Sequence, residues 1–385
     1  MTEALAPGAE GAHLLSRAAV IATAAVFGLT YSLTAPLIAL DLAERGFTEA
    51  MIGANAAMHA VGVLLTAMLL PRLVGRWRPR ALVVGALLLA AVTLALFPAM
   101  PLIWLWFPLR FLLGCASEVL FVLSETWINH LSEERSRARS MAAYTAALSL
   151  GFALGPLILS LLGTDGAVPY LAGAAIAALA IAFVLPRRVE APEFGEPHPG
   201  GLWRSLRLAP IAIATTVLNA ALETAGLSFL AIYAVSSGWP EGEATRLISA
   251  MMFGAILLQI PIGWLGDRLD RRRLTRMLGI LSVAGALLWP VVIHNPWLAY
   301  PVVFVWGGIF VGIYTLMLTL VGSRFRGTEL VGIYAVMAVT WGVGALLGPA
   351  LAGLAMAAHP HGLAFFAAAA CLAFVLFMGR VRSTT

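Results

Sequence analysis

The sequence contains no lysine, few charged residues and only two cysteines, and each shortage excludes a class of protein. A phosphate-binding loop of the G-x-x-x-x-G-K-[ST] type requires a lysine, so this chain does not drive pumping with ATP through such a loop. Charged residues make up 11% of its 385 residues, whereas a soluble domain contains roughly 25%. Cys115 and Cys371 both fall within apolar runs, so they do not indicate a disulfide framework.

Apolar residues dominate instead. They make up 61% of the chain, and the mean hydropathy is +0.92, which indicates that lipid is the solvent. The apolar runs are long and do not alternate, so we expect helices rather than a β-barrel. At about 20 residues per span, the sequence predicts an all-α integral membrane protein with twelve transmembrane helices, near residues 18–40, 50–70, 81–99, 103–128, 140–162, 168–185, 209–235, 245–264, 275–293, 297–321, 330–357 and 362–379.

The arginines predict the orientation of these helices. With both termini in the cytoplasm, all but three of the 24 basic residues fall in cytoplasmic segments. The exceptions are Arg45 and Arg246 in outer loops and Arg110 within a span. This bias follows the positive-inside rule and predicts a multi-pass protein of the inner (plasma) membrane. Because the positive charge is divided among many loops, it does not indicate nucleic-acid binding.

Residues 186–208 form the longest break between apolar runs and are rich in proline, glycine and charge. Such a composition is typical of a solvated linker. We therefore predict an N-terminal six-helix bundle over 1–185, a cytoplasmic linker over 186–208 and a C-terminal six-helix bundle over 209–385.

The two predicted bundles share sequence features at a constant spacing. The Gly-x-x-x-Gly-Pro segment at 151–156 recurs at 344–349, an offset of 193, and Leu73 aligns with Leu265, an offset of 192. Two matches at nearly one offset indicate an internal duplication, so we expect two pseudo-symmetric bundles that face each other across a cleft.

Several motifs resemble those of the major facilitator superfamily over nearly the whole chain. Residues 263–272, G-W-L-G-D-R-L-D-R-R, are similar to its loop signature, and their first-half counterpart, 71–80, is degenerate, with glycine at the aspartate position. The R-F-L-L-G segment at 110–114 resembles the family's R-x-x-x-G motif, and the glycines at 151–156 resemble a fifth-helix motif associated with its exporters. S-E-T-W-I-N at 124–129 is similar to YcaD-like members. The resemblance implies the major facilitator fold and transport by alternating access.

The loop motif predicts a gate at the cytoplasmic rim, formed by Gly263, Asp267, Arg268 and Arg271. Gly263 would allow close approach of helices, and Asp267 would meet the positive end of a neighbouring helix or pair with Arg271. We expect the helix that begins near Ser140 to be this neighbour. The alternative is a charged turn that only orients the loop.

Charged residues inside the fourth predicted helix are candidates for function, because ionisable groups in hydrocarbon are costly. Arg110, Glu118, Phe121 and Glu125 fall on one stripe of this helix at 100° per residue. Arg110 is a candidate to bind an anionic substrate group or a carboxylate partner, and a structural ion pair with Glu118 or with a neighbouring helix is the alternative. Glu118 is also a candidate proton carrier, and we assign Glu125 to gating.

Glu223 lies near the middle of the seventh predicted helix, one turn after Asn219. The repeat offset places it opposite Tyr31 of the first helix, so we expect both at the midplane of the cleft. A carboxyl that is protonated in one state and ionised in a wetter state provides proton coupling. A permanently protonated carboxyl that bonds across helices is the alternative.

The resemblance implies that the first, fourth, seventh and tenth helices line the cleft, and aromatic residues of these helices are candidates for an apolar substrate cavity. The alternative is ordinary core packing, which is common for aromatic residues in a membrane bundle. The candidates are Tyr31, Phe121, Trp306, Phe310 and Tyr314.

These features favour proton-coupled antiport that exports a small apolar or amphipathic compound. The alternative is import or facilitated diffusion of a small, possibly anionic, metabolite. An enzyme is not expected, because the sequence contains neither an H-E-x-x-H pair nor a nucleophile elbow. We predict no cofactor and no metal, and a monomer whose partners are a small-molecule substrate, protons and the lipid bilayer.

Overall fold

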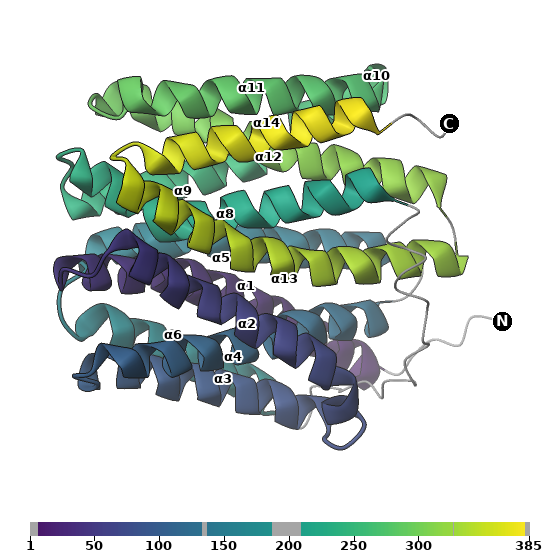
Figure 1. Cartoon of the computed structure of the whole chain (residues 1–385). Coiled ribbons are helices and arrows are strands. Elements are labelled where there is room, and N and C mark those ends of the chain that lie inside the picture. The colour runs from purple at the N-terminus through teal and green to yellow at the C-terminus, as the bar shows by residue number, and fades with distance from the viewer. Residues whose placement is uncertain (1–6, 133–136, 187–208, 326, 382–385) are drawn as a thin grey trace. The chain divides into compact units, whose positions relative to one another are not determined.

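The chain is entirely helical in the parts that its computed structural model describes, which are residues 7–132, 137–186, 209–325 and 327–381 (Figure 1). Eleven of the helical spans in these ranges are long and apolar enough to cross a membrane, and α6 is a shorter apolar helix. The predicted twelve spans are therefore confirmed, and the predicted linker lies almost wholly outside the described residues. The helices are α1 (Pro7–Glu44), α2 (Glu49–Val74), α3 (Pro79–Leu96), α4 (Trp106–His130), α5 (Arg137–Leu162), α6 (Val168–Val184), α8 (Pro210–Ser236), α9 (Glu241–Leu257), α10 (Gln259–Arg268), α11 (Arg271–Val292), α12 (Pro296–Arg324), α13 (Gly327–Ala358) and α14 (Gly362–Arg380).

The residues at the helix starts explain why the spans begin where they do. Pro210 and Pro296 occupy the first positions of α8 and α12, where the missing N–H of proline costs nothing. The Asp270 carboxylate accepts a hydrogen bond from the backbone N–H of Arg273 at 2.7 Å and caps α11. Asn295 caps α12 in the same way, through the backbone N–H of Trp297 at 3.1 Å.

The chain divides into two compact units. The first consists of Met1–Thr34 and Val61–Pro197, and the second of Ala35–Ala60 and His198–Thr385. This division differs from the predicted bundles, because the end of α1 and the beginning of α2 belong to the second unit. Gly53 and Gly353 explain the difference: a Cβ at Gly53 would lie 2.3 Å from the carbonyl oxygen of Pro349, and one at Gly353 would lie 2.4 Å from that of Glu49.

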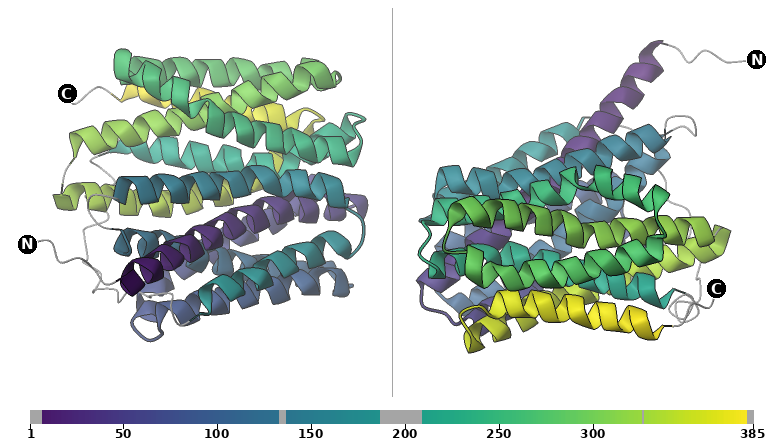
Figure 2. Two further views of the ribbon diagram at one scale, coloured as in Figure 1. Left: turned by 180° about the vertical axis from the view of Figure 1, so that it is seen from behind. Right: turned by 90° about the horizontal axis from the view of Figure 1, so that it is seen from above.

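In the first unit, α1 and α5 cross with their backbones in contact. A Cβ at Gly151 would lie 2.3 Å from the carbonyl oxygen of Ala25, and one at Gly155 would lie 2.7 Å from that of Leu29. The Ser32 hydroxyl donates a hydrogen bond across the crossing to the Gly151 carbonyl at 3.3 Å. Before this crossing, the first turns of α1 project beyond the neighbouring helices of the unit (Figure 2, right).

In the second unit, α8 and α13 make the same kind of crossing and run side by side (Figure 1). A Cβ at Gly344 would lie 2.4 Å from the carbonyl oxygen of Val217, and one at Gly348 would lie 2.3 Å from that of Ala221. Only glycine permits so close an approach of two helix backbones.

The two crossings are equivalent positions of a repeat. The carbonyl partners Ala25 and Val217, and likewise Leu29 and Ala221, are separated by an offset of 192 (217 − 25 and 221 − 29). This offset nearly equals the offset of 193 between the glycines that they contact. The contacts of two separate units thus support the duplication that the sequence indicates.

The eighth predicted span is broken into α9 and α10 at Leu258. Pro261 explains the break, because proline lacks the N–H that would bond the carbonyl of Leu257 and its ring crowds that carbonyl. On the α9 side of the break, a Cβ at Gly254 would lie only 1.8 Å from the carbonyl oxygen of Phe304, so α9 and α12 also touch through their backbones.

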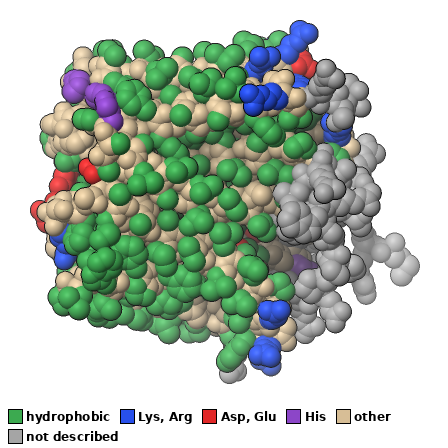
Figure 3. Space-filling view, in the orientation of Figure 1, with side chains coloured by type: hydrophobic (Ala, Val, Ile, Leu, Met, Phe, Trp, Pro, Cys, Tyr) green, Lys and Arg blue, Asp and Glu red, His purple; other side chains and the backbone are tan. Residues whose placement is uncertain are grey.

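A group of histidines connects helix ends at the surface of the second unit. The Tyr233 hydroxyl of α8 lies 2.9 Å from Nδ1 of His361 in the turn between α13 and α14. The backbone N–H of His361 donates to Nδ1 of His359 at 3.0 Å. Figure 3 shows histidine side chains together near the ends of α11 and α14, beside a face covered by hydrophobic side chains.

We expect the substitution Gly254→Ala to destabilise the protein by about 1–3 kcal/mol, because the added methyl group has no room against α12. Gly263→Ala is the matched control, since a Cβ at Gly263 would have nothing within 4 Å. It should be neutral or slightly stabilising through helix propensity. Thermal unfolding of both variants in one detergent tests this, and equal melting temperatures would contradict the proposed crossing.

We also expect acid to destabilise the protein partly through His361. Burial, followed by the nearby His359 and His294, lowers the pKa of His361 below its usual value. The unfolded chain, in which a histidine has a pKa of about 6.5, therefore binds this proton more readily than the folded chain. Stability that is complete above that pH is lost as the pH falls below it. Unfolding of His361→Gln between pH 7.5 and 5 should show a shallower loss of stability than the wild type, and equal slopes would disprove the assignment.

Candidate functional site

Glu223 lies on the most enclosed helix of the described chain. In the most apolar stretch of α8, 89% of the residues are buried, against 28–50% in the other long spans, because α8 contacts α9, α12, α13 and α14 of its own unit. Glu223 itself is partly exposed. Asn219 Nδ2 donates a hydrogen bond to Glu223 Oε2 at 3.2 Å. Among the described residues, no cationic side chain bonds this carboxylate.

Asn219 and Glu223 form a polar pair in which one hydrogen-bond acceptor is left without a donor among the described residues. Its side chain is buried, and its Oδ1 atom is buried without a hydrogen-bond partner among the described residues. An amide with a free acceptor beside a carboxyl can bond the acid as well as the carboxylate. The pair therefore tolerates both protonation states of Glu223.

The equivalent positions of the first unit carry aromatic rings instead. By the offset of 192, Asn219 corresponds to Phe27 and Glu223 corresponds to Tyr31. Phe27 and Tyr31 stack with their ring centroids 6.3 Å apart. One scaffold position is thus polar and titratable in the second unit and aromatic in the first.

Phe27 and Tyr31 belong to a larger aromatic cluster, made of Phe27, Tyr31, Phe121 and Phe152 from α1, α4 and α5. The centroid of Phe27 lies 5.9 Å from that of Phe121 and 6.1 Å from that of Phe152. Except for Tyr31, these rings are partly exposed. Sequence analysis named Tyr31 and Phe121 but missed Phe27, one turn before Tyr31, and Phe152, which lies between the two glycines of α5.

Arg110 is buried one turn into α4, and its side chain is only 3% exposed. Its Nε and Nη1 atoms are buried without hydrogen-bond partners among the described residues. The phenols of Tyr31 and Tyr170 are its electrostatic neighbours. The alternative of an ion pair between Arg110 and Glu118 is not realised within the described part of the chain.

The other two carboxyl groups of α4 are partly buried. Glu118 lies two turns beyond Arg110, and no described side chain forms a hydrogen bond or ion pair with it. Glu125 lies near Tyr144 of α5. The hydroxyl of Tyr144 lies 3.0 Å from that of Ser124, which connects α4 to α5 beside Glu125.

The aromatic candidates of α12 lie in packed interior. Trp306 and Phe310 are 2% and 1% exposed, and Trp306 donates a hydrogen bond from Nε1 to the Ser282 carbonyl of α11 at 2.9 Å. This differs from the expectation that they line a substrate cavity, because their rings have almost no free surface. Tyr314 is partly buried and packs against a core cluster that includes Met317.

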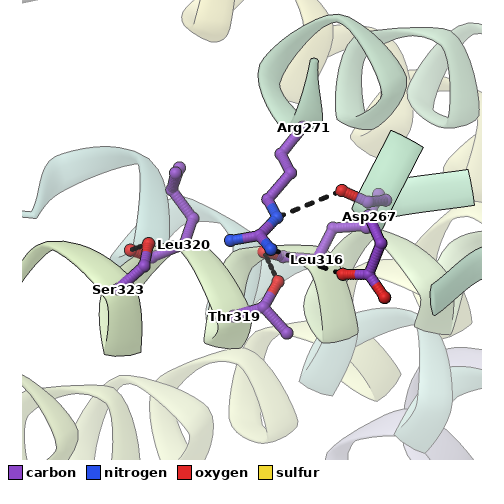
Figure 4. A network of polar contacts seen from close by, with 7 residues as sticks. Asp267, Arg271, Leu316, Thr319, Leu320 and Ser323 are labelled. Carbon is purple, nitrogen blue, oxygen red and sulfur yellow. Dashed lines mark hydrogen bonds and ion pairs between the residues drawn. The ribbon is translucent and has the colours of Figure 1, made fainter. Parts of the chain in front are cut away.

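The predicted gate residues lie where α10 meets α11 (Figure 4). Arg271 donates to the Gly266 carbonyl from Nε at 3.2 Å, and its Nη2 lies 3.5 Å from Oδ1 of Asp267. The Asp267 side chain is 78% exposed, so pairing with Arg271 is the contact made in this structure. Arg268 stacks over the ring of Trp264, 3.7 Å from its centroid.

Gly263 does not mediate the close helix approach that the sequence suggested. A Cβ at Gly263 would meet nothing within 4 Å, whereas one at Gly266 would lie 2.4 Å from Leu316 of α12. Gly266 lies on the face of α10 that packs against α12, and Gly263, three residues earlier, lies to one side of it.

Gln259 is a polar residue of this unit that sequence analysis missed. At the first position of α10, its Nε2 donates to the Ala255 carbonyl at 2.7 Å and to the Gly308 carbonyl at 3.3 Å. Its Oε1 accepts from the Thr315 hydroxyl at 2.7 Å. The amide thus joins the broken span to α12. The sequence does contain a signal for Gln259, because an amide side chain inside an apolar run, two residues before Pro261, is conspicuous.

Comparisons with known proteins agree with this architecture. The family model of the Major Facilitator Superfamily matches residues 20–326 and 211–384. The MFS-type transporter YfkF of Bacillus subtilis is 24% identical over 337 residues, 85% of each chain. An MFS-type transporter of Enterobacter sp. is 24% identical over 348 residues, 89% of each chain.

Solved structures show the same fold at low sequence identity. The nucleoside transporter NupG superposes with a TM-score of 0.77 at 14% identity, covering 96% of this chain and 100% of its own. A D-xylose-proton symporter superposes with a TM-score of 0.76 at 12% identity, covering 95% and 97%. The predicted fold class is therefore confirmed.

We expect Asp267→Ala to change the free energy of unfolding by less than about 1 kcal/mol, because its ion pair is exposed and screened by water. Asp270→Ala, three residues along, is the matched control and should cost about 1 kcal/mol or more, because it removes the cap of α11. Chemical unfolding of both variants provides the measurement. A larger loss for Asp267→Ala would indicate that the residue has a structural role.

Proposed function

Because this chain belongs to the major facilitator superfamily, we propose that it is a proton-coupled secondary transporter in which Glu223 carries the proton. Transport proceeds by alternating access, in which a central site opens to one side of the membrane at a time. The observation that carries this proposal is the Glu223 carboxyl group, which lies on the most enclosed helix with an amide, and no described cation, as its partner.

The physical argument concerns the cost of charge in hydrocarbon. A carboxylate that is shielded from water and lacks a countercharge costs several kcal/mol. Taking up a proton removes this cost when the site is closed, and contact with water removes it when the site is open. Each conformation therefore prefers one protonation state, and protonation shifts the populations by that difference. The free Oδ1 of Asn219 accepts the hydrogen bond of the protonated acid.

Glu118 is the second carboxyl of this mechanism. It is partly buried on α4 and has no described partner, so the same cost of charge applies to it. Glu125, near the end of α4, contributes to gating through its neighbour Tyr144.

The transported compound is small and apolar or amphipathic, and the protein exports it in exchange for protons. The aromatic cluster of the first unit supports this assignment, because it offers partly exposed rings, which favour apolar contacts over a polar substrate. The resemblance of the α5 glycine segment to an exporter motif supports the direction.

A second candidate function is uptake or facilitated passage of a small anionic metabolite. The buried guanidinium of Arg110, without a described carboxylate partner, favours it. The two functions differ in their response to a pH gradient, since only the coupled exchanger dissipates an imposed gradient when substrate is added.

The arginine distribution supports the proposal that both termini lie in the cytoplasm of a cell with an inner membrane, and we propose that one chain forms the transport unit. The end of α10, with Asp267 and Arg271, then lies at the cytoplasmic rim. There Asp267 exchanges its pairing with Arg271 for the positive end of a helix when the cytoplasmic side closes. Its exposure and its weak ion pair permit such an exchange.

We expect Glu223→Gln to abolish coupling while leaving the fold intact, because glutamine preserves shape and hydrogen bonding but carries no titratable proton. Infrared spectroscopy of purified protein should show a carboxylic acid band that this variant lacks. Glu243→Gln, at an exposed position, is the control and should keep that band.

The functional test uses proteoliposomes with a compound found by thermal-shift screening. The wild type should accumulate the compound when a pH gradient is applied, and Glu223→Gln should equilibrate it without accumulation. Accumulation at the wild-type level by Glu223→Gln would refute the role of Glu223.

A further inference from the structure

Arg110 is a buried cation whose anion is missing from the described chain. Its side chain is 3% exposed, and Nε and Nη1 are both buried without acceptors. Glu118, the nearest carboxyl on the same helix, is eight residues away, about 12 Å along the helix axis, and no salt bridge joins the two. The nearby ionisable groups are the phenols of Tyr31 and Tyr170.

A buried guanidinium without a partner destabilises the folded state. Buried donors without acceptors lose their hydration and gain nothing in return, and a buried charge without a partner destabilises more than an apolar residue of similar size. Tyrosine rings attract a guanidinium through their faces, but this attraction is weaker than a charge-assisted hydrogen bond. An unsatisfied group of this kind in a transporter is explained by a ligand that satisfies it.

Tyr31 connects this cation to the aromatic cluster. Its ring lies 5.7 Å from that of Phe152 and 6.3 Å from that of Phe27, while its phenol is among the electrostatic neighbours of Arg110. Tyr31, itself 9% exposed, contacts the partly exposed rings and interacts electrostatically with the guanidinium. A ligand that contacts both must therefore combine an apolar body with an anionic end.

We propose that the transported compound is an amphipathic organic acid, whose carboxylate binds Arg110 and whose apolar body packs on Phe27, Tyr31, Phe121 and Phe152. This substrate class rests on the proposed transport function. It deepens that function, because it assigns the head group to one residue and the body to the aromatic cluster. Recognition lies within the first unit, which also carries Glu118, whereas the main proton carrier, Glu223, lies in the second.

Three compounds with one body and different head groups test the proposal: 3-phenylpropanoate, 3-phenylpropanamide and 3-phenylpropylamine. Binding is measured calorimetrically on purified protein in lipid nanodiscs at pH 7.5, with no gradient. The wild type should bind the acid at least about tenfold more tightly than the amide, since hydrogen bonds to charged groups are strong. The amine should bind least, because it would add a second cation.

Substitutions identify the residue responsible for the preference for the acid over the amide. Arg110→Gln should lose the preference for the acid over the amide, and Arg110→Lys should keep part of it, because lysine retains the charge without the planar fork. Arg45→Gln is the control: Arg45 is an exposed arginine paired with Asp41 at 2.6 Å in the second unit, and its loss should change nothing. Phe152→Ala should weaken binding of the acid and the amide equally.

The melting temperature of Arg110→Gln without ligand shows whether Arg110 recognises a ligand or has a structural role. If Arg110 awaits a ligand, Arg110→Gln removes an unsatisfied charge, and its melting temperature should equal or exceed that of the wild type. A lower melting temperature, or failure to fold, would show that Arg110 has a structural partner and would overturn the proposal. Equal binding of acid and amide by the wild type, or a preference for the acid retained in Arg110→Gln, would also overturn it.

The same titrations on Glu223→Gln distinguish this inference from the proposed coupling mechanism. The preference for the acid should persist in that variant. If it persists while coupling proves independent of Glu223, the coupling mechanism fails and the substrate class stands. If the preference is absent while coupling depends on Glu223, the substrate class fails and the coupling mechanism stands.

Discussion

The direct contact of helix backbones at glycine is the constraint on which the rest of this structure depends. Between membrane helices there is no hydrophobic driving force, so close packing of small residues has to supply the association energy. The crossings of α1 with α5, α8 with α13 and α9 with α12 all place a glycine against a carbonyl oxygen of the facing helix. These contacts fix the helix registers, and the registers in turn decide which side chains meet inside each unit.

Because the first two crossings are related by the repeat, the two units share one helix arrangement but carry different functional side chains at equivalent positions. The helix turns at the crossing carry Phe27 and Tyr31 in the first unit and Asn219 and Glu223 in the second. Duplication preserved the glycines, on which the packing depends, while the facing residues diverged. One unit thus offers aromatic surface and a buried cation, and the other offers a carboxyl group paired with an amide. The proposed assignment of substrate recognition to the first unit and of the main proton carrier, Glu223, to the second is consistent with such divergence.

The second unit includes a segment from the first half of the chain. The segment Ala35–Ala60 packs with the second half of the chain, through Gly53 and Gly353, although it is continuous in sequence with helices of the first unit. The chain therefore passes between the units within α1 and again within α2, near Thr34 and Val61. Both α1 and α2 thus contribute residues to each of the two units.

The sequence alone determined the membrane location, the twelve helices and the repeat, because these depend on composition, on arginine placement and on spacing along the chain. It also identified Glu223, Asn219 and Arg110, since charged or polar residues within apolar runs are conspicuous. Only the tertiary structure decided what surrounds them. It revealed that Arg110 has no carboxylate partner among the residues that the structure describes, that Trp306 and Phe310 are core, and that Gly266 rather than Gly263 faces α12. Each of these depends on the rotation of one helix against another, which is set by contacts between residues far apart in sequence.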